Sequence, residues 1–192
     1  MRCVKASLLA VDGPSLLYRA FYALPDSIKD ESGRPVNALL GTTNLVLQEI
    51  ERHEPRAVVL CFGAEAAEYR VELHDGYHAD RPEVPDDLQP QWDLVPEFFG
   101  AFGWVVSTHQ TLEADDLLGS YARLETEAGG RALLLTGDRD MYQCASDDVL
   151  VLYLSTGVRG APEVGPDEVR ERDRIDPALV PDSTALRGDP SD

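Results

Sequence analysis

Two short segments of this chain gather five acidic side chains, and each lies at the edge of an apolar stretch. Residues 113–116 read Glu-Ala-Asp-Asp, and residues 136–140 read Thr-Gly-Asp-Arg-Asp, directly after the apolar run 132–135. Carboxylates held within a few ångströms of one another repel and take up protons, unless cations hold them together. Hard oxygen ligands with no nearby His or Cys cluster suit Mg²⁺ or Mn²⁺. The two segments therefore predict a site for divalent metal ions.

The overall charge of the chain limits the partners that it can hold. Its 192 residues include 17 basic and 35 acidic side chains, which gives a formal net charge of −18. Nucleic-acid binding draws much of its affinity from neutralised phosphates, so this overall field repels a polyanion. Only Lys5 and Lys29 are lysines, and the other cations are arginines, whose planar fork suits bidentate phosphate contacts. A nucleic-acid partner would need cations that are local or supplied elsewhere.

The cysteines and the N-terminal residues bear on the compartment. Cys3, Cys61 and Cys144 are unevenly spaced and form no CxxC pattern, which favours reduced thiols in a cytoplasmic protein. The apolar stretch 8–11 is much too short for a signal sequence or a membrane span. We expect a cytoplasmic protein without a targeting segment and without a membrane partner.

Apolar runs alternate with amphipathic stretches along the chain, whose hydrophobic content of 43% is enough for one good core. This alternation predicts an α/β fold with a mostly parallel central sheet and helices on both faces. A polar, proline-containing segment over about 65–90 is expected to be an exposed insertion. The expected strands are 7–11, 57–62, 104–106, 132–135 and 149–154. One helix is expected to begin at Pro14. Further helices are expected over 36–53, 93–102, 113–128 and 166–173, with a bend or break of the second of these at Pro96.

Acidic side chains from three separate elements should meet at one edge of this sheet. Asp12 and Asp138 each end a predicted strand, and ligands of parallel sheets bind beyond the carboxyl ends of the strands. Glu113 and Asp116 are three apart on a predicted helix and share one face, with Asp115 beside them. Acids are also ordinary in a first helical turn or after a strand, so neither segment is decisive alone. Their convergence indicates a metal site, and whether the metal does chemistry stays open at this point.

Five motifs occur in an order that is similar to a known family. Residues 17–21 read Leu-Tyr-Arg-Ala-Phe shortly after Asp12, and residues 77–82 read Tyr-His-Ala-Asp-Arg-Pro. The two acidic segments follow, and residues 188–192 read Gly-Asp-Pro-Ser-Asp. From about residue 7 to 192, the chain resembles the 5′-to-3′ exonuclease domain of bacterial DNA polymerase I and its stand-alone relatives. These belong to the flap endonuclease group of PIN-like nucleases.

The resemblance implies a two-metal phosphodiester hydrolase of DNA replication and repair. Its expected partners are DNA with a 5′ flap, a nick or a 5′ end, and RNA primers, and its cofactors are two Mg²⁺ or Mn²⁺ ions. By motif position, the first ion would be held mainly by Asp12, Glu113, Asp115 and Asp116. The second would be held by Asp138, Asp140, Asp189 and Asp192, with Asp115 between the two ions. The implied catalytic residues are Asp12, Glu113, Asp115, Asp116, Asp138 and Asp140.

The resemblance also divides the chain into parts. Residues 1–192 would form a single PIN-like catalytic domain, and the insertion 65–90 falls where the family has a helical arch for single-stranded 5′ ends. Four basic side chains are then expected to contact phosphates: Arg19, Arg70, His78 and Arg81. A solvated charged face is their plain alternative. The helix-hairpin element that grips duplex DNA in the family is apparently absent, which predicts a fragment of a longer nuclease with feeble DNA affinity.

Three departures from the family pattern affect these expectations. Gly63 stands where polymerase-type relatives have an Asp, so one ligand is missing and a water or Glu65 would have to replace it. His78 stands where relatives commonly have Lys, which predicts an activity component that rises toward pH 6. The pairs 172–173 (Arg-Asp) and 183–184 (Ser-Thr) are polar where relatives tend to be apolar or aromatic. This difference predicts a loosely docked C-terminal tail.

Two other functions compete with the nuclease. The first is a nucleic-acid-binding module of the same fold with weakened turnover, which Gly63 favours and the other retained carboxylates disfavour. A pure binder gains nothing from a costly cluster of like charges. The second is a phosphatase with an aspartyl nucleophile, which would have another Asp two residues after Asp12. Residue 14 is Pro, so that interpretation fails. Nothing in the sequence indicates an obligate oligomer.

Overall fold

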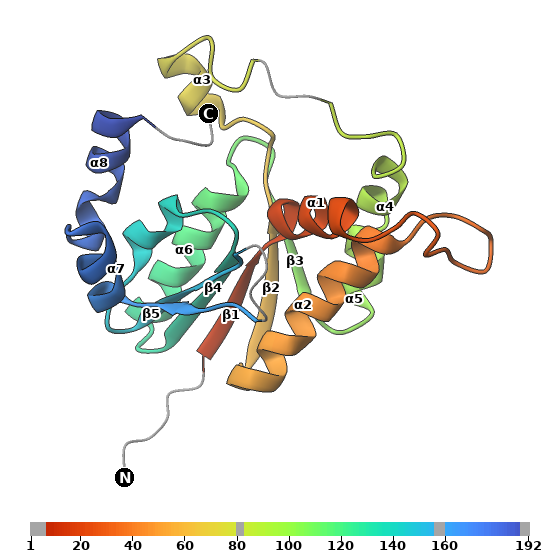
Figure 1. Cartoon of the computed structure of the whole chain (residues 1–192), viewed down its shortest axis with the longest axis horizontal. Helices are drawn as coiled ribbons and strands as arrows, with labels where there is room; N and C mark the ends of the chain where they lie inside the picture. Colours follow the sequence, from red (N-terminus) through yellow and green to blue (C-terminus); the bar gives the residue numbers. More distant parts are fainter. Residues whose placement is uncertain (1–6, 80–82, 156–159, 189–192) are drawn as a thin grey trace.

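A single sheet of six strands forms the centre of the molecule (Figure 1). The computed structural model describes residues 7–79, 83–155 and 160–188. The strand order is β3-β2-β1-β4-β5-β6, and all neighbours are parallel except β6, which runs antiparallel to β5. The strands are β1 (Ser7–Asp12), β2 (Ala57–Phe62), β3 (Val105–Thr108), β4 (Arg131–Thr136), β5 (Val149–Tyr153) and β6 (Glu163–Val164).

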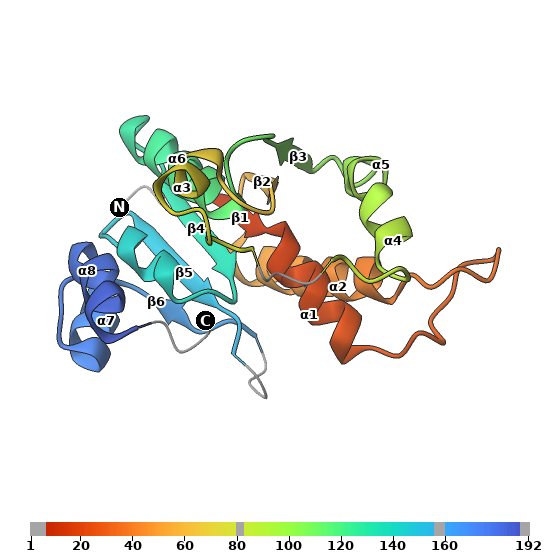
Figure 2. The ribbon, with the colours of Figure 1, turned by 90° about the horizontal axis from the view of Figure 1, so that it is seen from above.

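Helices cover both faces of this sheet, as the sequence predicts (Figure 2). One face carries α1 (Gly13–Ala23), α2 (Asn37–His53), α4 (Gln89–Asp93) and α5 (Val95–Gly100). The other carries α6 (Ala114–Glu127), the 3-10 helix η1 (Asp140–Cys144), α7 (Pro166–Asp173), the 3-10 helix η2 (Pro177–Leu179) and α8 (Val180–Arg187). In β1, Leu9 and Val11 join the first layer, while Leu8 and Ala10 join the second. A strand buried on both faces needs an unbroken apolar run, which explains why the central strands were readable from sequence.

Most predicted elements are confirmed, with differences near the insertion. The predicted helix 93–102 is two short helices, α4 and α5, which meet at Leu94, and each has Pro in its first turn. The insertion contains α3 (Glu68–Leu73) and is mainly exposed between the buried residues Ala67 and Leu88. The insertion therefore ends before residue 90, because α4 begins at Gln89.

The C-terminal helices are docked, so the prediction of a loosely docked tail is wrong for residues 160–188. Val169 of α7 and Val180 of α8 are buried in the same cluster as α6. Thr184 adds a hydrogen bond from Oγ1 to Oδ1 of Asp140, at 3.3 Å. Val169 and Val180 thus anchor two otherwise polar helices in the buried layer that contains α6.

Two further findings concern the cysteines and the helices. Cys61 is buried, Cys144 is half-buried, and neither is in a disulfide, while Cys3 lies outside the described residues. Burial, followed by the nearby acidic groups, raises the pKa of Cys61 to about 12 and that of Cys144 to about 11, so both stay protonated.

None of the described helices combines the length and apolarity needed to cross a membrane.

Candidate metal centre

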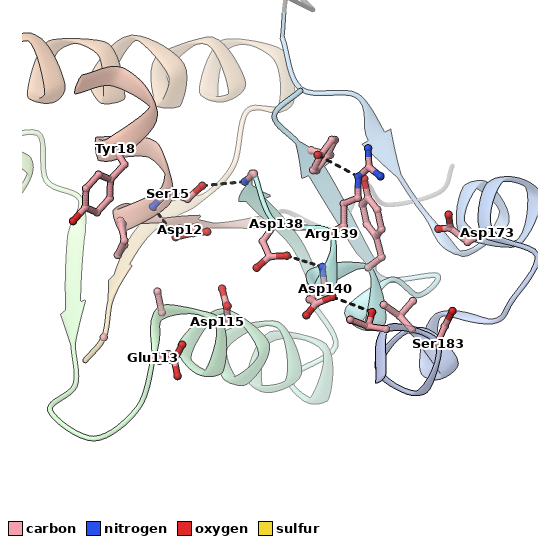
Figure 3. Close-up of a pocket in the computed structure, with 18 of the residues that line it drawn as sticks. Asp12, Ser15, Tyr18, Glu113, Asp115, Asp138, Arg139, Asp140, Asp173 and Ser183 are labelled. Atoms are coloured by element: carbon pink, nitrogen blue, oxygen red, sulfur yellow. Dashed lines mark hydrogen bonds between the residues drawn. The ribbon is translucent and has the colours of Figure 1, made fainter. Parts of the chain in front are cut away.

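A cavity of about 1080 Å³ opens beyond the carboxyl ends of β1 and β4. Its wall includes side chains from β1, the start of α6, the β4–η1 turn and the C-terminal helices. Figure 3 shows the carboxyl groups of Asp12, Asp115 and Asp138 directed toward the same space. The cavity wall contains five of the predicted metal ligands: Asp12, Glu113, Asp115, Asp138 and Asp140.

Asp12 is fixed by hydrogen bonds to both carboxylate oxygens. It caps α1, because its Oδ1 accepts the Ser15 N–H at 3.1 Å. Its Oδ2 accepts the Thr136 hydroxyl at 2.7 Å, and that hydroxyl is fully buried at the end of β4. These contacts tie the ends of β1 and β4 together and orient the Asp12 carboxylate before any ligand arrives.

The turn after β4 places Asp138 and Asp140 beside Asp12. The Thr136 Oγ1 accepts the Asp138 N–H at 3.0 Å, and the Asp138 Oδ1 accepts the Asp140 N–H at 2.8 Å. Side-chain oxygens that accept backbone N–H groups two residues on are typical of tight turns. The Thr-Gly-Asp-Arg-Asp segment therefore folds into a turn that its own side chains hold in place.

Asp115 shows most clearly that these carboxylates crowd one another. It is the second residue of α6 and projects into the cavity. Burial, followed by the charges of Asp12, Asp138 and Glu113, raises the pKa of Asp115 to about 8. A carboxyl group with this pKa favours either a proton or a metal ion at neutral pH.

Glu113 and Asp116 are arranged differently, because the insertion supplies them with a cation. The Arg70 guanidinium pairs with Oε1 of Glu113 at 2.7 Å and with Oδ1 of Asp116 at 2.8 Å. Tyr69 donates its hydroxyl to Asp116, and Tyr77 donates its hydroxyl to Glu113. Burial alone would raise the pKa of Glu113, but the Ala67 N–H and Arg70 outweigh it and lower that pKa.

The predicted metal ligands thus fall into two sets. Asp116 does not line the cavity, because its Oδ2 accepts the Glu113 N–H at 2.9 Å and its Oδ1 faces Arg70. Glu113 lines the cavity but is engaged with the insertion. Asp189, Asp192 and Arg81 lie outside the described residues.

The three described side chains expected to contact phosphates all have partners within the protein. Arg70 is held by Glu113 and Asp116, and Arg19 donates to the carbonyl oxygen of Leu154 at 2.6 Å. His78 has a φ of 56° and stacks on Tyr77, and its Nδ1 lies 3.0 Å from the carbonyl oxygen of Glu65.

Gly63 lies against the backbone at the start of α6. A Cβ at this position would lie 2.3 Å from the Leu112 carbonyl oxygen and 2.5 Å from the Ala114 nitrogen. The adjacent Ala64 N–H donates to the same Leu112 oxygen at 2.8 Å. The absence of a carboxylate at position 63 and the close approach of α6 therefore go together, because no side chain fits between residue 63 and the backbone of residues 112–114. Glu65 lies on the cavity wall two residues further on.

The donor set fits hard divalent ions in chemistry. Across residues 7–79, 83–155 and 160–188, no three acidic, His or Cys side chains are already arranged to hold an ion. The charges of Asp12, Asp138 and Glu113 nevertheless add to the effect of burial in raising the pKa of Asp115. Carboxylate oxygens without thiolate or imidazole neighbours are the set that Mg²⁺ or Mn²⁺ prefers, with water completing the coordination.

Several residues of the site were missed by the sequence analysis. Thr136 and Ser15 position the acidic turn, since Thr136 bonds Asp12 and the Ser15 Oγ accepts the Gly137 N–H at 3.3 Å. A hydroxyl residue directly before Gly-Asp, at the end of a strand, is the signal that could have identified Thr136. Nothing local distinguishes the cavity-facing arginines, which come from the C-terminal half of the chain: Arg139, Arg172 and Arg187.

Comparison with known proteins identifies the family of this chain. The chain is 39% identical over 189 residues to DNA polymerase I of Mycobacterium leprae, covering 98% of this chain and 21% of that protein. It is 35% identical over 209 residues to a 5′-3′ exonuclease of Mycobacterium tuberculosis, covering 98% of this chain and 65% of that protein. The chain thus spans less than two thirds of either relative.

Solved structures share the fold at low identity. T5 5′-exonuclease with bound divalent zinc ions is 18% identical, with a TM-score of 0.69 over 95% of this chain and 67% of that one. T5 flap endonuclease in a complex with DNA and metal ions is 18% identical, with a TM-score of 0.68 over 95% of this chain and 66% of that one. Residues 7–173 match the family model described as the 5′-3′ exonuclease, N-terminal resolvase-like domain. The chain belongs to this 5′-3′ exonuclease family.

Proposed function

We propose that this chain is the catalytic domain of a divalent-metal-dependent 5′-to-3′ exonuclease and 5′-flap endonuclease. The observation that carries the proposal is the convergence of Asp12, Asp115 and Asp138 on one cavity, with the pKa of Asp115 raised to about 8. Crowded carboxylates do not stabilise the folded protein by themselves, and a bound cation would neutralise their repulsion. The substrate would be a phosphodiester bond of DNA at a 5′ flap, a nick or a 5′ end, or one of an RNA primer.

Two Mg²⁺ or Mn²⁺ ions would supply a nucleophilic water and charge stabilisation at the leaving oxygen. Asp12, Asp115, Asp138 and Asp140 are the residues we assign to them, and Asp189 and Asp192 would complete the set by motif position. Ser15 and Thr136 orient Asp12, and the turn N–H of Asp140 orients Asp138. These fixed contacts hold the carboxylates ready, which lowers the reorganisation needed when substrate binds.

The insertion is assigned to the 5′ end of the substrate. Arg70, Tyr69 and Tyr77 fix its base to the start of α6, beside the cavity. The proposed role of Arg70 is therefore to position the insertion over the carboxylates, with Arg19, His78 and Arg81 as phosphate contacts.

Single-turnover cleavage of 5′-labelled flap DNA tests the proposal. The chain is used in large excess over DNA, at low salt with Mn²⁺, so that weak affinity does not hide the chemistry. Asp138→Asn is the matched control, since it removes one charge and keeps the shape. Cleavage near the flap junction that the control abolishes is the expected result. Cleavage that persists unchanged in Asp138→Asn would rule out this site.

A nucleic-acid-binding module with weakened turnover is the second candidate, and Gly63 favours it. The position lacks a carboxylate, and no side chain fits there without moving residues 112–114. This candidate predicts DNA binding without cleavage in the same assay. Isothermal titration with Mn²⁺ separates the two, because a functional two-metal site binds two ions and loses at least one in Asp138→Asn.

A further inference from the structure

Three arginines from the C-terminal half of the chain line the same cavity as the carboxylates. Arg139, Arg172 and Arg187 all line the cavity, and they come from the η1 cap, α7 and α8 respectively. The crowded carboxylates Asp12 and Asp115 come from β1 and α6. In a chain with a formal charge of −18, this grouping of arginines is a local exception.

Two of these guanidiniums are held in place by tyrosines. Arg172 lies over the Tyr142 ring, with its Cζ 4.3 Å from the ring centroid, and its Nη1 donates to the Tyr142 hydroxyl at 3.0 Å. Arg139 lies over the Tyr153 ring at 5.6 Å, and its Nε donates to the Tyr153 hydroxyl at 3.3 Å (Figure 3). Stacked arginines lose little further rotamer freedom when they bind a ligand.

One of these three arginines, Arg172, forms an ion pair within the described part of the chain. Arg172 makes a two-fold contact with Asp173, at 3.0 and 2.6 Å. The Arg172 hydrogen bond first, and then the charges of Arg139 and Arg187, hold the pKa of Asp173 below its usual value. In the described part of the chain, neither Arg139 nor Arg187 has a carboxylate within ion-pair distance. Within the described residues, Asp173 is therefore the acidic side chain that forms an ion pair with this group, through Arg172.

We propose that Arg139, Arg172 and Arg187 form a phosphate-binding edge that holds the sugar-phosphate backbone of a nucleic-acid strand beside the metal-binding carboxylates. The inference rests on the proposed function and adds a binding site to it. Guanidinium groups match phosphate oxygens in geometry and stay charged at any working pH. Thr184, on α8 beside Arg187, bonds Asp140, so the edge is continuous with the acidic turn.

The edge should attract a strand without metal, which allows a test independent of cleavage. The probe is a 5′-labelled single-stranded oligothymidylate, followed by fluorescence anisotropy in EDTA over a series of salt concentrations. Each phosphate contact on a single strand contributes about 0.7 to the slope of log K against log salt. Losing one contact therefore weakens binding about 5- to 10-fold at 50 mM salt and lowers the slope by about 0.7.

Arg187→Gln is the main variant, because Arg187 is exposed and the variant breaks no ion pair of the described structure. Arg172→Gln is the second variant. Arg172→Lys keeps the charge, so it should retain most of the salt-dependence slope that Arg172→Gln loses. Arg170→Gln is the matched control. Arg170 lies on α7 with Arg172 but pairs with Asp167 and Asp176 and does not line the cavity. The control should leave the slope unchanged.

Equal effects of Arg187→Gln and Arg170→Gln would overturn the proposal, as would a lack of measurable binding at low salt by the unmodified chain. The failure of the proposed function looks different. In that case the flap DNA is not cleaved with Mn²⁺, but oligothymidylate binding in EDTA still depends on Arg172 and Arg187. Cleavage without any dependence of binding on these arginines would leave the nuclease assignment standing and remove the phosphate-binding edge.

Discussion

Two groups of carboxylates meet at the start of α6, and their electrostatic environments are opposite. Glu113 and Asp116 receive the Arg70 guanidinium, and we call them the paired group. Asp115 faces Asp12 and Asp138, and we call these three the cavity group. The pKa of Glu113 is lowered, whereas that of Asp115 is raised to about 8. Asp115 and Asp116 are adjacent in one motif, but only Asp116 is paired with a cationic side chain of the protein.

Helix geometry separates the two groups. Successive residues of an α-helix point about 100° apart, so Asp115 and Asp116 face different directions in this structure. Asp116 turns toward the insertion and caps the helix, and Asp115 turns toward the cavity. The acidic motif thus combines a structural half, which fixes the insertion, with a half that is left for a ligand.

The largest expected effect separates Asp115 from Asp116 in catalysis. Asp115→Asn should slow single-turnover cleavage about 10³-fold, because metal-ion catalysis supplies several kcal/mol of transition-state stabilisation. Asp116→Asn should reduce the rate far less and instead lower the unfolding free energy by about 1 kcal/mol, as expected for a weakened helix cap. Rates and urea unfolding curves of both variants check this. Equal rate losses would mean that Asp116 turns into the cavity when substrate binds.

The next effect is the pH dependence of stability without metal. The pKa of Asp115 is about 8 in the folded protein, against a reference value of 3.8. Between these values the folded protein keeps a proton that the unfolded chain has lost, so the unfolding free energy falls as pH rises from about 4 to 8. The slope is at most about 1.4 kcal/mol per pH unit for one proton. Asp115→Asn should remove this fall.

Thermal unfolding in EDTA across this pH range measures the effect, and added Mg²⁺ sharpens it. A metal ion that replaces the proton should raise the melting temperature most at pH 8, and the gain should vanish in Asp115→Asn. The paired group behaves oppositely: the pKa of Glu113 is lowered, so its contribution is lost only as pH falls below its usual range near 4.5. A flat curve from pH 4 to 8 would contradict the crowding of the cavity group.

Sequence patterns located the cavity group because local rules determine it. Asp12 ends the buried strand β1, Asp138 follows the buried strand β4 by two residues, and Asp115 lies in the first turn of α6, so topology alone brings them to one sheet edge. The same reasoning placed Glu113 and Asp116 with them. It could not foresee that Arg70, expected to contact phosphates, pairs with Asp116, which lies 46 positions away along the chain and is reached only after the insertion folds back.

Two features of the fold escaped prediction for similar reasons. β6 has only two residues, so no periodic pattern exists to identify it. Gly63 could be identified as a missing carboxylate, but its contact with residues 112–114 depends on how α6 approaches β2. Long-range contacts of this kind come from packing of the whole sheet and leave no local signal.

Gly63 provides the third test, on the boundary between the two groups. Gly63→Ala should lower the unfolding free energy by about 1 to 3 kcal/mol, because the Cβ meets backbone atoms that cannot turn aside. Gly63→Asp should be no better, so simple restoration of the carboxylate is not expected to raise activity. Gly100→Ala is the control, since nothing lies within 4 Å of its Cβ position. Urea unfolding of the variants checks this, and equal stabilities would contradict the close approach of α6.

The smallest effect is expected at Arg70, whose loss should convert the paired group into a second crowded one. Its side chain is 28% exposed, so Arg70→Gln should destabilise the contact by about 1 to 2 kcal/mol, between surface and buried ion pairs. The Ala67 N–H, which donates to Glu113 at 2.8 Å, should then exchange with solvent about tenfold faster. Hydrogen exchange measures this directly.

Arg123→Gln on α6 removes an equal charge from an exposed pair with Glu127 and should leave exchange of the Ala67 N–H unchanged. Arg70→Lys should lie between, since an ammonium group cannot bridge two carboxylates as a planar guanidinium does. If Arg70→Gln exchanged no faster than Arg123→Gln, the base of the insertion would be held by its tyrosines alone. The difference between the two carboxylate groups would then come from helix geometry, with no contribution from the arginine.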